Sequence, residues 1–77
     1  MVEVFPNPAT NQLQIVNSGL PIYEIRIINV NGNDVFQCEE GLNDNKTIDI
    51  SCLLPGPYLI ILKNEKGTIR KKIVIQK

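Results

Sequence analysis

Hydrophobic and polar residues alternate along most of this chain, with a period of two residues rather than the longer period of a helix. In one segment, two charged residues separate Tyr23, Ile25 and Ile27. Such a segment has one apolar and one polar face, which is typical of a strand with one side in a core and one in water. The same alternation recurs at 13–16, 47–50 and 69–76. The pattern therefore predicts a chain of β-strands.

Pairs of turn-forming residues separate these strands. Asn31-Gly32 is the strongest short hairpin signal, because both residues tolerate the positive φ of a type I′ turn. We therefore expect a hairpin there, with segment 34–38 as the return strand. Pro55-Gly56 predicts a type II turn, since proline fixes φ at the second position and glycine supplies a positive φ at the third. Lys66-Gly67 predicts a further turn before the last strand.

Segment 58–62 is apolar on both faces, which predicts a central strand covered on each side. With a short opening strand at 2–5, seven strands follow one another at the spacing of an antiparallel sandwich or barrel. We therefore expect an all-β fold, a small immunoglobulin-like antiparallel β-sandwich of about seven strands, formed by one domain over residues 1–77. The core positions expected from the alternation are Leu13, Ile15, Ile25, Ile27, Val35, Ile48, Ile50, Ile60, Leu62 and Ile73.

The charges balance at eight acidic and eight basic residues. A protein that binds nucleic acid needs a basic excess to displace counterions, so the balance argues against nucleic acid as a partner. The charges are unevenly distributed, because residues 1–45 carry six acids against one base and residues 46–77 carry seven bases against two acids. We expect the two halves to attract each other across paired strands. The alternative is a functional basic patch around Arg70, Lys71 and Lys72.

No segment approaches the ~20 apolar residues that span a membrane, so we expect no direct membrane insertion. The first residues lack the basic and apolar regions of a signal peptide. An exported form of this domain would therefore depend on an upstream segment to leave the cytoplasm.

Residues that carry catalysis or hold cofactors are scarce. The chain has no histidine, which removes the commonest general base and the commonest metal ligand. Two cysteines cannot build a zinc site alone, and Cys38 and Cys52 are too far apart for a Cys-x-x-Cys motif. We expect two unpaired thiols, with a disulfide as the alternative in an oxidising compartment. We predict no catalytic residue, no cofactor and no metal site.

Two motifs indicate more than a generic β-domain. In the first, over 5–15, an aromatic residue precedes Pro6-Asn7-Pro8 and an alternating strand follows. The prolines fix φ and favour extended geometry at the residues before them, which predicts a stiff connection into the strand. In the second motif, over 48–59, Asp-Ile-Ser and two leucines precede Gly56 and Tyr58.

Two further segments complete the pattern: a central hairpin over 25–35 and a basic, apolar ending over 71–77. In this order and spacing, over nearly all 77 residues, the chain resembles the C-terminal sorting domains (type A) of the type IX (Por) secretion system. It departs from the family at Phe5, where tyrosine is commoner. It also departs at Pro57, which removes a backbone donor and indicates a sheet edge or bulge.

The resemblance implies a secretion signal at the C-terminus of a secreted or cell-surface protein of a Gram-negative bacterium. Its partners would be the type IX translocon, a surface sortase that cleaves the signal off, and an N-terminal cargo domain. The cargo would cross the inner membrane by its own signal peptide and reach the outer membrane through the periplasm. The alternative function is an immunoglobulin-like accessory module that binds carbohydrate or mediates adhesion.

The residues expected to take part in recognition lie in the first, second and last of these segments. They are Pro6, Asn7, Pro8, Gly56, Tyr58, Lys71, Lys72, Ile73, Val74 and Ile75. We expect Ile73 and Ile75 to be buried, and Lys71, Lys72 and Lys77 to point outward beside the strand. A translocon component would then read the lysines together with the backbone edge, by strand addition. The alternative is that the lysines only protect an edge strand from aggregation.

Overall fold

Two antiparallel sheets form the fold of the computed structural model, which describes residues 2–39 and 45–76. One sheet has three strands in the order β1-β2-β5, and the other has four in the order β4-β3-β6-β7. The described strands are β1 (Val2–Phe5), β2 (Gln12–Asn17), β3 (Ile22–Ile28), β4 (Asp34–Cys38), β5 (Asn45–Asp49), β6 (Gly56–Asn64) and β7 (Gly67–Ile75). The predicted all-β fold of seven strands is confirmed.

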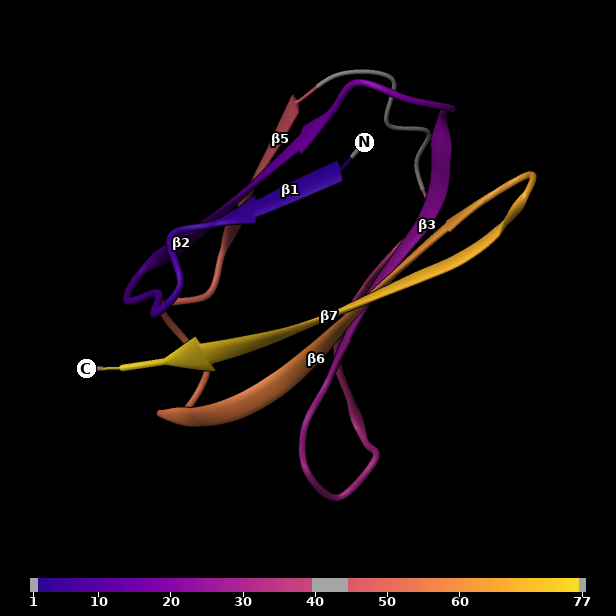
Figure 1. The fold of residues 1–77 in the computed structure, drawn as a ribbon. Helices are drawn as coiled ribbons and strands as arrows, with labels where there is room; N and C mark the ends of the chain where they lie inside the picture. The colour runs from indigo at the N-terminus through magenta and orange to yellow at the C-terminus, as the bar shows by residue number, and fades with distance from the viewer. Residues whose placement is uncertain (1, 40–44, 77) are drawn as a thin grey trace.

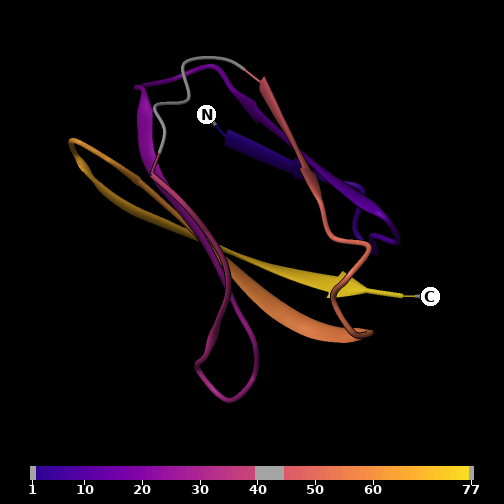
Figure 2. The same ribbon diagram turned by 180° about the vertical axis from the view of Figure 1, so that it is seen from behind.

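The two sheets lie as separate layers (Figures 1 and 2). The chain changes sheet after β2, after β4 and again after β5. As a result β2 pairs with β1 and β5, and β3 pairs with β4 and β6. Two of the five pairings, β2 with β5 and β3 with β6, thus join strands that are distant in sequence. Residues of both sheets share one apolar core between the layers.

The core is made almost entirely of branched aliphatic side chains. Nine of the ten predicted core residues are buried. The exception is Val35, which is half-buried because β4 is a short strand at the edge of its sheet. Ile75 is also buried, as expected. The sequence interpretation missed five buried residues: Val2, Ala9, Asn17, Ile22 and Ile61.

Strand β6 is central, as predicted, since it lies between β3 and β7. On its inner face Ile60 and Leu62 are fully buried against the core. The predicted cover on both faces is wrong, because among the described residues no second layer of strands lies over its outer face. Ile61 is nevertheless only 9% exposed, and the register places Arg26 and Arg70 on either side of it. The long aliphatic part of an arginine side chain can cover apolar surface in this position.

The hairpin between β3 and β4 is confirmed, but the predicted type I′ turn is wrong. Such a turn needs a positive φ at both central residues, and only Gly32, with φ 83°, has one. Asn29 explains the difference, because its side-chain oxygen accepts hydrogen bonds from the N–H groups of Asn31 (3.0 Å) and Asn33 (3.1 Å). Its backbone carbonyl also accepts from Gly32 N–H at 3.0 Å. The hairpin is therefore closed by a longer loop with one left-handed glycine.

The predicted type II turn at Pro55-Gly56 is also wrong. Gly56 has φ 146° rather than the ~80° of that turn, and it is the first residue of β6. A type II turn here would close on the N–H of Pro57, which proline lacks. The expected sheet edge at Pro57 is confirmed: it pairs with Val74 of β7, whereas the pairing of β6 with β3 extends only as far as Leu59.

The ion pairs only partly follow the predicted attraction between the two halves of the chain. Lys63 Nζ lies 3.0 Å from Glu24 Oε2, which joins the basic half to the acidic half. Arg26 instead pairs with Asp34 at 2.7 Å, within the acidic half.

The two thiols are separate in the structure. Cys38 packs against the core from β4, and Cys52 is exposed in the turn after β5. Among residues 2–39 and 45–76, no helix is long and apolar enough to cross a membrane.

Candidate functional site: one end of the sandwich

The loop between β1 and β2, residues 6–11, packs along the outer edge of β7. Asn7 makes two of the contacts: its Nδ2 donates to the carbonyl of Lys72 (3.2 Å), and its Oδ1 accepts from the N–H of Val74 (3.1 Å). A primary amide has both a donor and an acceptor, so one side chain here replaces part of a neighbouring strand. The Phe5–Pro6 and Asn7–Pro8 peptide bonds on either side are both cis.

Ala9 makes the other two contacts with β7, through its backbone. Its N–H donates to the carbonyl of Val74, and its carbonyl accepts from the N–H of Gln76, both at 2.8 Å. These bonds form an isolated parallel bridge between Ala9 and Ile75. The Ala9 side chain is fully buried, so a larger residue there would have to displace the core. The Pro-Asn-Pro motif is thus attached to the C-terminal half of β7.

The second motif reaches the same end through the connection from β5 to β6. Ile50 N–H donates to the carbonyl of Asn11 at 2.9 Å, which joins this connection to the first motif. Asp49 Oδ1 accepts from Ser51 N–H at 2.9 Å, and Ile50 C=O accepts from Leu53 N–H at 3.0 Å. The Asp-Ile-Ser segment therefore folds as an Asx turn followed by a hydrogen-bonded turn.

Gly56 and Tyr58 lie directly beside the C-terminal strand. In the register of β6 with β7, Gly56 pairs with Ile75 and Tyr58 pairs with Ile73. The Tyr58 hydroxyl donates to the carbonyl of Leu54 at 2.6 Å, and its ring packs against the core. Tyr58 thus fastens the preceding turn to the sandwich.

The predicted site residues therefore gather around one half of one strand. In Figure 1 this region is the left end of the molecule, where the indigo loop, the start of β6 and the end of β7 lie together. All ten predicted residues belong to β7, to the loop bonded to it, or to the paired start of β6. Sequence reasoning missed Ala9 and Asn11, because their contacts are made by backbone atoms and leave no residue-type signal.

One expectation for this strand is wrong. Lys71 and Lys72 were expected to point outward together with Lys77, which lies outside the described residues. Adjacent residues of a strand, however, face opposite sides of the sheet. Lys72 is exposed on the outer face, whereas Lys71 is half-buried on the inner face beside Ile73. Arg70 shares the outer face with Lys72 and is also exposed.

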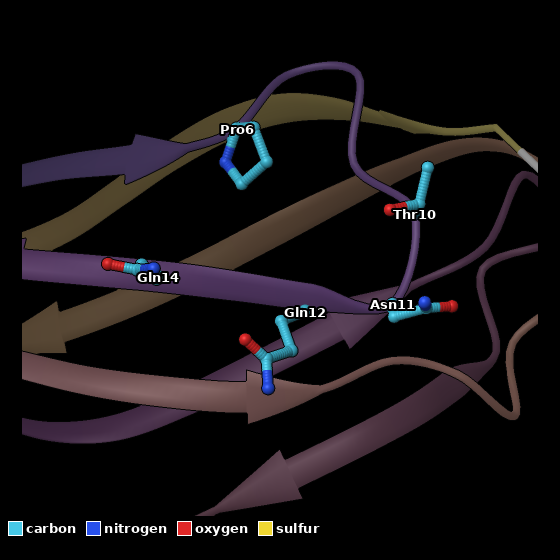
Figure 3. Close-up of a pocket in the computed structure, with 5 residues that line it drawn as sticks. All are labelled: Pro6, Thr10, Asn11, Gln12 and Gln14. Atoms are coloured by element: carbon cyan, nitrogen blue, oxygen red, sulfur yellow. The ribbon is translucent and has the colours of Figure 1, made fainter.

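A hollow of about 400 Å³ lies next to the first motif. Figure 3 shows the residues that line it from the loop and from β2. They are Pro6, Thr10, Asn11, Gln12 and Gln14. All five are exposed and none is charged, so the hollow holds no acid–base pair. Nor do three His, Cys, Asp or Glu side chains gather as a metal site anywhere in residues 2–39 and 45–76.

The fold and this end of it define a small two-sheet β-domain in which several sequence motifs, distant along the chain, are assembled on one surface. The comparison with known families gives the particular kind of domain. The family described as "Secretion system C-terminal sorting domain" matches residues 3–76, and the chain belongs to this family. It is a type IX secretion signal domain, as the resemblance implied. No curated protein matches the chain.

Membership has two direct consequences. The family is defined as a secretion signal and not by a catalytic activity. A protein that carries such a signal is handled by the type IX secretion machinery and is secreted or attached to the cell surface.

Proposed function

We propose that this chain acts as one domain, over residues 1–77, that the outer-membrane translocon of the type IX system recognises. The recognised surface is the end of the sandwich described above, with Asn7, Lys72 and Val74 near its centre. A surface sortase then removes the domain from its cargo by cutting ahead of β1. The cargo reaches the periplasm by its own signal peptide, and the domain itself catalyses nothing.

One observation carries the proposal. The first, second and last motifs are separated by as many as 67 positions, the distance between Asn7 and Val74, yet they meet around the C-terminal half of β7. A core needs no such gathering of motifs, since alternation alone buries the apolar faces. A single partner that recognises several motifs can contact them together only if the fold brings them onto one surface.

The accessory binding module remains the second candidate, and the hollow beside Pro6 is the feature that favours it. Its lining of amide and hydroxyl groups suits hydrogen bonding to a polar ligand. It has no aromatic side chain in that lining, however, on which a sugar ring would stack. The sorting signal therefore accounts for more of the structure.

The proposal is tested by fusing residues 1–77 behind a periplasmic reporter in a cell that has the translocon. We expect the reporter in the medium or on the cell surface. The same reporter without the domain, and the fusion in a strain that lacks the translocon, should both stay in the periplasm. Retention of the fusion in the translocon-containing strain would contradict the proposal.

The same assay can distinguish the contributions of Lys71 and Lys72 to export, because the two residues lie on opposite faces of β7. Lys72→Gln should lower export, since it removes an exposed charge from the proposed surface, and Lys71→Gln should lower it less. Lys72→Gln should keep its unfolding free energy within about 0.5 kcal/mol, as surface substitutions usually do, and Lys71→Gln, at a half-buried position, within about 1 kcal/mol. Full export of a stable Lys72→Gln variant would show that this lysine is not read and only protects the edge.

A further inference from the structure

Strand β7 is an edge strand, and only part of its edge is occupied. The sheet order leaves it with β6 as its single neighbour. From the carbonyl of Lys72 to the N–H of Gln76, the outer backbone groups are bonded to Asn7 and Ala9. A partner strand therefore cannot pair with this half of β7, although the sequence analysis expected strand addition there.

The other half of the edge is open. In an antiparallel strand, every second residue directs both backbone groups to the same side. Because Lys72 and Val74 direct theirs outward, Thr68 and Arg70 do the same. Within the part of the chain that the structure describes, no group bonds to these outward positions or to the Lys72 N–H. Figures 1 and 2 show that the β6–β7 turn beside them projects away from the three-stranded sheet.

Among the described edges, that of β7 suits a partner strand best. Strands β1, β4 and β5 also lie at edges, but they have only four, five and five residues. The pairing of β4 is also interrupted by a register shift. Short and bulged edges discourage strand addition. Strand β7 has nine residues, which pair with β6 without a shift.

Charge then selects the kind of partner. Arg70, Lys71 and Lys72 are consecutive, and Arg70 and Lys72 are exposed on one face without an ion pair to any described residue. A second copy of β7 laid antiparallel on this edge would bring like charges together, which is unfavourable. A strand with carboxylates at alternate positions would instead place them opposite the two cations.

We propose that residues 68–72 form a docking edge for an extended, acidic segment of a partner protein, which adds to the sheet as a strand beside β7. The loop at Asn7 and Ala9 limits the added strand to this half. The inference rests on the proposed function, because the partner is the component that reads the sorting signal. Recognition of the C-terminal strand is thereby assigned to residues 68–72 and to a partner segment that carries carboxylates.

The test is an NMR titration of the 77-residue chain with an eight-residue peptide that alternates glutamate and valine. The matched probe alternates lysine and valine. We expect the glutamate peptide to shift the amide signals of Thr68, Arg70 and Lys72 and to slow their exchange with solvent. The amides of Val74 and Gln76 should stay unchanged. Shifts elsewhere, equal effects of both peptides, or no effect would each overturn the proposal.

Two variants test the charge and the backbone separately. Arg70→Glu should weaken binding of the glutamate peptide by about fivefold or more. Lys66→Glu makes the same charge change in the exposed β6–β7 turn and should leave affinity nearly unchanged. Thr68→Pro removes an outward N–H without a change of charge, a substitution that edge strands tolerate, and should also weaken binding. If Thr68→Pro unfolds the chain, the comparison of Arg70→Glu with Lys66→Glu decides.

The reporter assay distinguishes failure of this inference from failure of the proposed function. Retention of the unmodified fusion in the periplasm contradicts the proposed function. Export of the unmodified fusion together with equal export of a folded Arg70→Glu variant overturns the docking edge alone.

Discussion

Pro57 and Tyr58 determine together how the chain enters β6. Proline at position 57 has no N–H to close the turn that Pro55-Gly56 would otherwise form. The carbonyl of Leu54, which that turn would have used, accepts the hydroxyl of Tyr58 at 2.6 Å instead. A side chain thus supplies the hydrogen bond that the backbone cannot make.

This contact predicts the effect of Tyr58→Phe. The variant keeps the ring in its place against the core but leaves the Leu54 carbonyl without its donor, so the free energy of unfolding should fall by about 1 kcal/mol. For a domain of this size the melting temperature should drop by about 4–8 °C. Tyr23→Phe is the matched control, because Tyr23 is 52% exposed and its hydroxyl has no partner among the described residues. Equal melting temperatures for the two variants would refute the role of the hydroxyl.

Alternation predicted the burial of single residues well wherever a strand faces the other sheet. It failed for Val35, whose position in an edge strand leaves it half-buried. It also missed Ala9, which lies outside the strands and is buried by a loop that returns to β7. Burial of such a residue depends on which element the loop packs against, and the hydrophobic periodicity of the sequence gives no information about that.

At the scale of elements, β6 supports the sandwich because it pairs on both sides and buries Ile60 and Leu62 completely. Ile60→Ala removes a branched side chain from the centre of the core and leaves a cavity, so it should cost about 2–5 kcal/mol. A domain of this length has a total stability of only about 4–10 kcal/mol. We therefore expect this variant to be marginally folded at room temperature.

Urea unfolding of the Ile60→Ala variant measures this cost. Val30→Ala is the control, since it also shortens a β-branched side chain but lies in the β3–β4 hairpin loop with 74% of its surface exposed. It should change stability by no more than about 0.5 kcal/mol. An Ile60→Ala variant as stable as the control would mean that β6 is not central to the core.

The strands were predictable from the sequence, whereas the turn types were not. Period-two alternation and glycine placed all seven described strands, because both are local signals. The turn at Asn31-Gly32 differed from expectation because the Asn29 side chain takes over two backbone donors. Which of two turn geometries forms therefore depends on side-chain hydrogen bonds that a dipeptide signal does not include.

At the scale of the whole molecule, the site could be predicted only as a set of residues. The motifs identified its members, but not that Asn7 and Ala9 would bond to the edge of β7. Those contacts join the two ends of the chain and depend on the final register of both sheets. The same contacts occupy the C-terminal half of the edge at which strand addition was expected, whereas the two lysines are separated by the alternation of the strand itself.

The central claim is that the first motif and the C-terminal strand form one surface because they are hydrogen-bonded to each other. Amide hydrogen exchange of the 77-residue chain tests this residue by residue. Val74 N–H is bonded to the Asn7 side chain and Gln76 N–H to the Ala9 carbonyl, whereas the amides of Thr68 and Arg70 have no described partner.

We predict that the amides of Val74 and Gln76 exchange slowly although β7 is an edge strand, and that those of Thr68 and Arg70 exchange quickly. Asn7→Ala should then accelerate exchange at Val74 by roughly fivefold or more, the equivalent of one lost hydrogen bond. Exchange at Ile60 in the core should change much less. Exchange at Val74 and Gln76 as fast as at Thr68 in the unmodified chain would contradict the account, because the two motifs would then not be joined.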